Sequence, residues 1–437
     1  MNKYNKIKSF RYDTYQMLVK ARDATFELMD SIMTTQNANS VAEFSLSPLF
    51  LRKWHSTYEA IKDSRPNSNQ LMKRYIQEIP QLDYILLGLD NTHWEFKDAK
   101  TMKDRGYQYS GSSINSSILG QGYSTIAWLP PLDVKGSWTL PLRHERITSF
   151  ENAISKATWQ LKQVSKYLPP STNKLAVLDC EYGNGSFIKQ TAQIEISKLI
   201  RIRSNCCLYT EPQMYSGRGR PRRHGHKFKL NDPQTHLDAD EEIEIKDDCL
   251  GLIKISKWKN LHFRNAYKQK LSLVKIERLQ EKKTGIKHRP LWLIWAGEEF
   301  LALEKIWSQY RRRFGVDHWY RFAKQRLHWT LPNFGSPLQC QRWSNLIVNI
   351  TWQLWLGREL VQQLYLPWQQ PQENLTPQRV AQSMISLLIE IGSPTRVSKT
   401  RGKSRGCKKG TTRMKRKRYP VVKKRQSKSK KSAKKAA

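Results

Sequence analysis

Residues 84–94 read YILLGLDNTHW, an apolar run that ends in polar side chains. This pattern is typical of a buried strand whose end reaches the edge of a sheet. Further strands are predicted at 118–132, 136–147, 174–179 and 198–209, with helices at 151–168 and 187–196. Three strands, a helix, a strand, a helix and a strand predict a mixed α/β sheet with helices on its faces.

The chain of 437 residues has a formal net charge of +39, and 38% of it is apolar, including 15 Trp. Most of it should therefore fold, as two or three domains. Residues 396–437 carry 20 Lys or Arg and no acid, which leaves 56 basic and 37 acidic residues elsewhere. Because the excess is not confined to the tail, we expect a polyanionic partner, most commonly nucleic acid, rather than a merely solubilising surface.

Cysteine use and hydropathy indicate a cytoplasmic protein. The six cysteines form no C-x-x-C pair and no spacing typical of zinc or of a disulfide framework. The N-terminus, MNKYNKIKSFRYD, lacks the apolar core of a signal peptide, and no apolar run approaches the length of a membrane span. We therefore expect neither export nor a membrane partner.

Composition divides the chain into five predicted segments. Residues 1–80 have apolar positions at three-four spacing and predict a helical domain that either binds DNA or packs on the core. Residues 81–212 hold the mixed sheet, and 213–297 predict a β-rich insertion with strands near 250–257, 271–277 and 290–296. Residues 298–394 predict helices at 298–327, 345–366 and 377–392, and 395–437 a disordered basic tail.

A polar helix face is predicted within 298–327. Tyr310, Arg313, Asp317 and Lys324 follow the spacing Y-x2-R-x3-D-x6-K. At roughly 100° per residue they fall within an arc of about 60° on one helix. A soluble helix normally buries an apolar stripe, so this face suits a metal ion beside a phosphate backbone.

Three aspartates are candidate metal ligands. Asp90 and Asp179 each close an apolar strand, and Asp317 lies on the polar helix face. Each alone is more often a turn former or helix cap, but cleavage of a phosphodiester by two divalent metals needs convergent carboxylates that are distant in sequence. Glu298 and Glu299 are rival third acids whose spacing to the cations does not fit.

These residues carry a resemblance to a known family. The chain resembles the DDE-type transposases of bacterial insertion sequences, in the branch with the signature Y-x2-R-x3-E-x6-K. Similar segments include LDNTHWEFKDAKTMKDRGYQY, GQGYSTIAWL, SWTLPLRHERI, GRGRPRRHG, RGKSRG and RYPVVKK, so the resemblance runs from about residue 10 to about residue 425.

The resemblance implies an RNase H-like catalytic domain interrupted by the β-rich insertion. It implies that Asp90, Asp179 and Asp317 bind two Mg²⁺ ions, for which Mn²⁺ can substitute, and that Tyr310, Arg313 and Lys324 hold DNA ends. The implied activity is cleavage of double-stranded DNA at element ends and strand transfer into target DNA, with no small-molecule substrate. A homodimer and association with the nucleoid are further expectations.

One departure from the signature leaves alternatives open. The third acid is Asp317 where the family has Glu, so its carboxylate reaches one methylene less. Because magnesium demands strict octahedral geometry, the chain could be a working variant, or a catalytically inactive or domesticated DNA-binding protein. A nuclease of the same fold that hydrolyses without joining is the third possibility.

Two basic segments outside this signature are candidate DNA contacts. The loop at 217–223 contains RGRP, similar to the core of an AT-hook, so its arginines either enter a narrow minor groove or touch phosphates without preference. The arginines are Arg218, Arg220, Arg222 and Arg223. The tail at 396–437 is expected to add nonspecific affinity, and the alternative is that it is solvated and idle.

Overall fold

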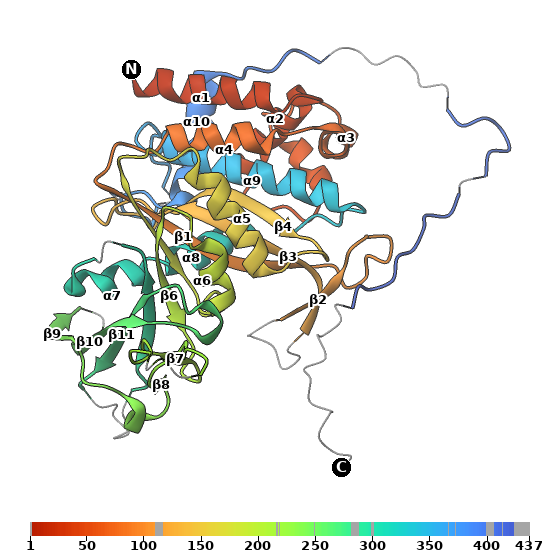
Figure 1. Cartoon of the computed structure of the whole chain (residues 1–437). Coiled ribbons are helices and arrows are strands. Elements are labelled where there is room, and N and C mark those ends of the chain that lie inside the picture. The colour runs from red at the N-terminus through yellow and green to blue at the C-terminus, as the bar shows by residue number, and fades with distance from the viewer. Residues whose placement is uncertain are drawn as a thin grey trace.

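A computed structural model describes residues 2–109, 117–215, 217, 219–248, 250–280, 288–298, 301–365, 367–371, 373–398, 406–412 and 414–423. Its centre is a mixed sheet with the order β4-β3-β1-β5-β6 (Figure 1). The strands are β1 (Tyr84–Glu95), β3 (Ser117–Trp128), β4 (Leu140–Ile147), β5 (Asn173–Leu178) and β6 (Ser197–Ile202). β1, β3 and β4 are antiparallel neighbours, whereas β5 and β6 run parallel to β1. This confirms the predicted RNase H-like sheet.

Helices cover both faces of the sheet because its strands alternate their side chains. On one face, Ser124 of β3 donates a hydrogen bond to Gln160 of α5 (Ala153–Ser165) at 2.7 Å. The short α6 (Gly185–Thr191) follows β5. On the other face, Thr125 meets Tyr320 of α8 (Phe314–Gln325), and α9 (Pro337–Gly357) packs along β4.

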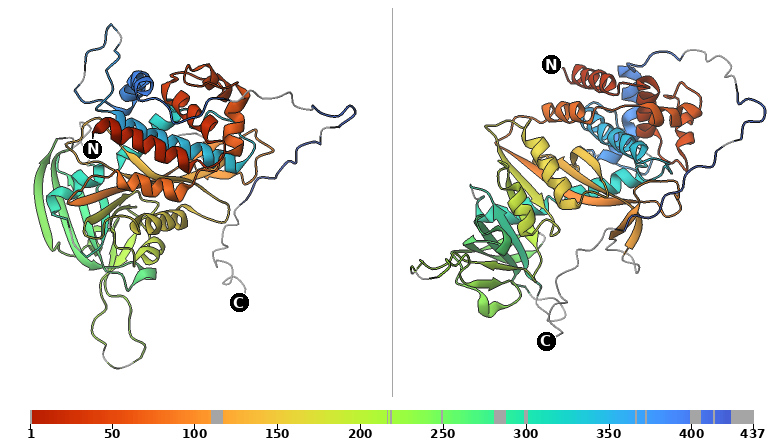
Figure 2. Two further views of the ribbon diagram at one scale, coloured as in Figure 1. Left: turned by 90° about the horizontal axis from the view of Figure 1, so that it is seen from above. Right: turned by 45° about the vertical axis from the view of Figure 1, so that its right-hand side comes forward.

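The N-terminal helices pack on the core through α9. They are α1 (Lys3–Met17), α2 (Arg22–Thr34), α3 (His55–Asp63) and α4 (Ser68–Gln77), with the 3-10 turn η1 (Val41–Leu46), and α10 (Pro377–Ile391) joins them (Figures 1 and 2). Arg11 of α1 bonds Asp30 of α2 at 2.8 Å and Gln353 of α9 at 2.5 Å. Tyr75 of α4 stacks on Trp352 of α9, with ring centroids 5.5 Å apart.

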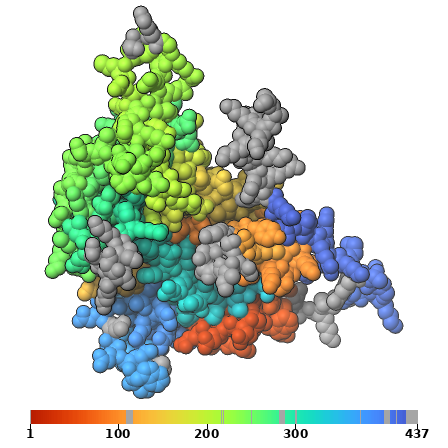
Figure 3. All heavy atoms as spheres, turned by 90° about the horizontal axis from the view of Figure 1, so that it is seen from below, coloured from red at the N-terminus to blue at the C-terminus, as the bar shows by residue number. Residues whose placement is uncertain are grey.

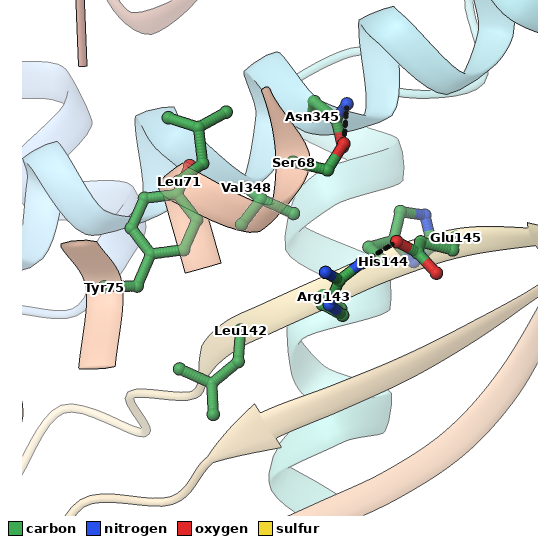
Figure 4. A pocket seen from close by; sticks show the side chains of 9 residues that line it. All are labelled: Ser68, Leu71, Tyr75, Leu142, Arg143, His144, Glu145, Asn345 and Val348. Atoms are coloured by element: carbon green, nitrogen blue, oxygen red, sulfur yellow. Dashed lines mark hydrogen bonds and ion pairs between the residues drawn. The ribbon is translucent and has the colours of Figure 1, made fainter. Parts of the chain in front are cut away.

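Figure 4 shows the junction of α4, α9 and β4 from close by. Asn345 of α9 donates a hydrogen bond to Ser68 of α4 at 3.0 Å, and Arg143 pairs with Glu145 on β4. The cavity between them is about 10 Å³, which is about the space of one water. This junction is therefore close-packed core.

The β-rich segment extends the central sheet, which the sequence analysis did not foresee. Its elements are β7 (Cys207–Tyr209), β8 (Lys227–Lys229), η2 (Pro233–Thr235), β9 (Glu241–Asp247), β10 (Gly251–Leu261), η3 (Arg264–Ala266), β11 (Leu271–Arg278) and β12 (Leu291–Ala296). β12 pairs antiparallel with β6, so β12, β11, β10 and β9 continue the sheet. With β2 (Gly106–Tyr109) on the outer edge of β3, the described residues give a sheet of ten strands.

Two predicted helical segments have other bounds than expected. The segment 298–327 is two helices, α7 (Leu303–Arg311) and α8, joined by hydrogen bonds of the 3-10 type such as Arg313 N to Tyr310 O at 3.0 Å. The predicted helix 345–366 is α9, which begins earlier because Pro337 occupies its first turn. No described helix is long and apolar enough to cross a membrane.

Part of the predicted disordered tail is ordered against the sheet. We call residues 414–423 the C-terminal segment. The amides of Tyr419 and Val422 donate to the carbonyls of Lys100 and Arg105 at 2.9 and 2.7 Å. Figure 1 shows this blue segment returning beside β2, where the unpaired edge of that short strand is available. Residues 399–405, 413 and 424–437 of the tail lie outside the described residues.

Candidate active site

Two of the three candidate aspartates lie side by side at the centre of the sheet. Leu89 of β1 pairs in parallel register with Leu178 of β5, so the next residues, Asp90 and Asp179, occupy neighbouring positions. Adjacent strands are about 4.8 Å apart. The apolar sequences of both strands bury them, and the first acid after each buried run therefore comes to the same place.

The third aspartate reaches this place from α8 through Arg313. Nη1 of Arg313 lies 2.7 Å from Oδ2 of Asp90 and 3.5 Å from Oδ2 of Asp317. The Arg313 and Asp90 side chains are 6% and 13% exposed, whereas that of Asp317 is 48% exposed. We call Asp90, Asp179, Asp317 and Arg313 the aspartate site. Its only exposed carboxylate is thus the one that departs from the family signature.

The electrostatics of the aspartate site favour a bound cation. Burial raises the pKa of the Asp90 carboxyl to about 7; the carboxylates of Asp317 and Asp179 also raise it, and Arg313 opposes them. Among the described residues, Oδ1 of Asp179 is buried without a hydrogen-bond partner. A divalent cation would relieve both the repulsion among the carboxylates and this unpaired oxygen.

The site is not preassembled as a metal centre. In the described ranges, no group of three or more His, Cys, Asp or Glu side chains is arranged to hold a metal ion. Arg313 gives the reason, since one of its nitrogens contacts two of the three carboxylates. The donors present are the hard carboxylate oxygens that Mg²⁺ and Mn²⁺ prefer, so the residues fit the ion in chemistry, and Arg313 would have to yield its position.

The two remaining members of the spaced signature differ in accessibility. Lys324 donates a hydrogen bond to Thr92 of β1 at 2.9 Å, and burial lowers the pKa of its ammonium group. Tyr310 is only 2% exposed, and burial, followed by the charge of Asp179, raises the pKa of its hydroxyl, against the effect of Arg313. A DNA contact by Tyr310 would therefore need local movement, and that role stays a prediction.

The sequence analysis missed a buried hydrogen-bond relay behind Asp90. The Tyr320 hydroxyl donates to the backbone carbonyl of Asp90 at 2.9 Å and lies 2.8 Å from the hydroxyl of Thr125. That hydroxyl lies 2.8 Å from Nδ1 of His144 on β4. Tyr320 follows Asp317 by three residues on the same face of α8, so helical spacing could have identified it; Thr125 and His144 carry no local signal.

The AT-hook-like loop is separate in the chain from the aspartate site. Arg218 lies outside the described residues, and Arg220, Arg222 and Arg223 are exposed. Figure 3 shows the yellow-green loop protruding from the insertion. The Arg223 guanidinium lies 5.1 Å from the centre of the Tyr267 ring, a cation–π contact that holds it on the body. DNA contacts by these arginines stay predictions.

Comparison with known proteins agrees with this fold. A family model described as DDE superfamily endonuclease matches residues 14–269, a span that includes Asp90 and Asp179 and ends before Asp317. A search of curated proteins found no match. Because the model covers more than half of the chain, the protein is a member of the DDE superfamily endonucleases and acts on DNA.

Proposed function

We propose that this protein is a DNA transposase that cleaves phosphodiester bonds at element ends and joins the freed 3′ hydroxyl to target DNA. The observation that carries the proposal is the meeting of Asp90 with Asp179 on adjacent parallel strands, and with Asp317 through Arg313. These acids come from three distant parts of the chain, as a metal-dependent phosphoryl-transfer site requires.

Each residue of the site has a role in this chemistry. Asp90, Asp179 and Asp317 would hold Mg²⁺, which activates the attacking oxygen and stabilises the leaving oxygen of an in-line displacement. Arg313 would exchange carboxylate for DNA phosphate, since a guanidinium binds both in the same bidentate way. Lys324 donates a hydrogen bond to Thr92 of β1, and its ammonium group would neutralise a further phosphate.

A catalytically inactive DNA-binding protein is the second candidate. Two observations favour it: Asp317 is shorter than the family's Glu, and Arg313 pairs with the carboxylates that a metal needs. A nuclease without strand transfer is the third candidate, and it shares the whole aspartate site with the transposase. Only the products of the reaction separate these candidates.

The experiment incubates the full chain with DNA that carries the sequences flanking its reading frame and with a supercoiled target plasmid, in Mg²⁺ and in Mn²⁺. Joined products support the transposase, and nicks without joining identify a nuclease. Binding without cleavage in either metal identifies the inactive protein, because manganese tolerates looser ligand geometry. Asp179→Asn provides the background, since it keeps the shape of the side chain and removes its charge.

A further inference from the structure

A large groove lies at the end of the sheet beside β2. Its volume is about 1180 Å³, and it is bordered by α3, the segment 101–104, the end of β4, the segment 333–342 and the C-terminal segment. Two acids line it, Glu59 and Asp104, and Asp104 is paired with Arg146. Six cations line it, and we call it the basic groove: Lys62, Lys103, Arg146, Arg342, Arg416 and Lys417.

The C-terminal segment is one wall of the basic groove. Val422 forms a parallel bridge with Gly106 on β2, and its amide donates to the Arg105 carbonyl at 2.7 Å. The Tyr419 ring has Lys103 and Lys417 on it, at 5.0 and 5.6 Å from the ring centre. These contacts fix exposed cations of the tail at a defined place beside the other cations that line the groove.

The basic groove lies farther along β1 than the aspartate site, behind the buried Trp94. Along one face of β1, Asp90 meets Arg313 and Thr92 meets Lys324. Two residues further, Trp94 packs against Phe334, which lines the groove. At a rise of about 3.3 Å per residue, Trp94 lies roughly 13 Å from Asp90, a distance that about four nucleotides of one strand cover.

The groove also presents apolar side chains to solvent. Phe150 is 99% exposed and Leu338 is 65% exposed, and both line the groove among its cations. Exposed aromatic rings beside cations suit nucleic acid, because the cations neutralise its phosphates and the rings can contact its sugars and any unpaired bases. Because the chain belongs to a family of endonucleases that act on DNA, DNA is the polyanion that we assign to these cations.

We propose that the basic groove binds the phosphate backbone of DNA next to the cleaved bond, and that the C-terminal segment clamps this DNA against the body. The inference deepens the proposed function and rests on it for the position of the scissile bond. It assigns Arg416 and Lys417 a specific place on the DNA, rather than a share in the diffuse attraction of the whole tail.

The test measures binding of the full chain to a short fluorescent DNA duplex over a salt series, without divalent metal. Arg416→Gln with Lys417→Gln is compared with Lys408→Gln with Lys409→Gln, which removes the same charge from a part of the tail outside the groove. The logarithm of the binding constant falls linearly with the logarithm of the salt concentration, and the steepness of this line decreases by about 0.9 for each phosphate contact removed. We expect the first pair to lower the slope by about two and the second pair to leave it nearly unchanged.

A second variant tests the clamp without changing charge. Val422→Pro removes the amide that donates to Arg105 and keeps every cation, so it should weaken binding several-fold, as the first pair does. Equal losses for both charge pairs, or wild-type binding by Val422→Pro, would overturn the proposal. Because no metal is present, failure here is distinct from failure of the transposase: normal joining with unchanged binding rejects only the groove.

Discussion

The aspartate site and the basic groove use the same kinds of side chain in opposite environments. Arg313 is nearly buried and pairs with carboxylates, whereas Arg416 and Lys417 are exposed in a groove of cations. A buried pair costs desolvation and holds its geometry, while exposed charges are screened by salt and attract from a distance. We therefore expect the aspartate site to control cleavage and the basic groove to control affinity.

The strongest challenge to this division is removal of one carboxylate at the centre of the sheet. Asp179→Asn should reduce cleavage by more than the roughly 100-fold that loss of a supporting residue costs, because a neutral amide cannot replace a charged metal ligand. Duplex binding in the absence of metal should stay within about two-fold, as expected for a residue outside the phosphate contacts. Initial cleavage rates and binding titrations check both expectations.

The matched control is Asp83→Asn, which changes an exposed aspartate just before β1. It should cleave as the unmodified chain does. Equal loss of cleavage in both variants would place the effect in net charge and remove the aspartate site from the chemistry.

A second variant tests whether the Asp317 side chain is too short to place its carboxylate in the best position for a metal ion. Asp317→Glu restores the reach of the family's residue and should keep or raise cleavage in Mg²⁺, whereas Asp317→Ala should abolish it. The comparison is made by cleavage rates in Mg²⁺ and Mn²⁺, and the advantage of Glu should be smaller in Mn²⁺. If Glu abolishes cleavage while Ala does not, Asp317 is not a ligand.

Removal of one hydroxyl from the relay behind Asp90 should have an intermediate effect on cleavage. Tyr320→Phe removes the hydroxyl that bonds the Asp90 carbonyl and Thr125, which should cost about 1–3 kcal/mol of stability and roughly 10-fold in cleavage. Denaturant unfolding and cleavage rates are the measurements. Tyr12→Phe, at an exposed tyrosine, is the control, and a relay variant that behaves like it would show that Asp90 needs no such support.

The smallest effect on cleavage, and a clear effect on stability, is expected from His144. Burial, with a smaller effect of Lys324, lowers the pKa of His144 to about 3, from an ordinary value of 6.5. Below pH 6.5 the His144 imidazole binds a proton in the unfolded chain but stays neutral in the folded chain. The free energy of unfolding therefore falls as the pH drops from 6.5 towards 3, by up to about 1.4 kcal/mol per pH unit.

Urea midpoints between pH 7 and pH 5 test this expectation. His144→Gln should reduce the number of protons taken up on unfolding by about one, so the free energy of unfolding should depend less steeply on pH. This holds even where the variant is less stable at pH 7. Lys417→Gln, which changes an exposed charge in the basic groove, should leave the slope as it is. Parallel curves for all three proteins would show that His144 does not titrate on unfolding.

Much of this fold and site could be predicted from local sequence. The apolar run before Asp90 and the similar run before Asp179 predict buried strands, because periodicity reports burial directly. The order of elements then predicts the mixed sheet that the structure has. Asp90 was expected to close its strand, but β1 continues to Glu95, whereas β5 ends at Leu178. The two aspartates therefore meet through the parallel register of β1 with β5 and not at a shared strand end.

What the sequence by itself determined is therefore the buried strands at the centre of the sheet, the chemistry of the acids and cations, and the excess of positive charge. It did not determine β2 or β8, and the single strand predicted at 198–209 is two strands, β6 and β7. The tertiary structure decided the pairing of β12 with β6, the Arg313 contact with two carboxylates, the relay from His144 to Asp90, and the return of Val422 to β2. The physical reason is range. The burial of a segment and its hydrophobic periodicity are encoded in neighbouring residues. An edge strand, in contrast, accepts any compatible partner, and a side-chain contact can depend on segments hundreds of residues apart.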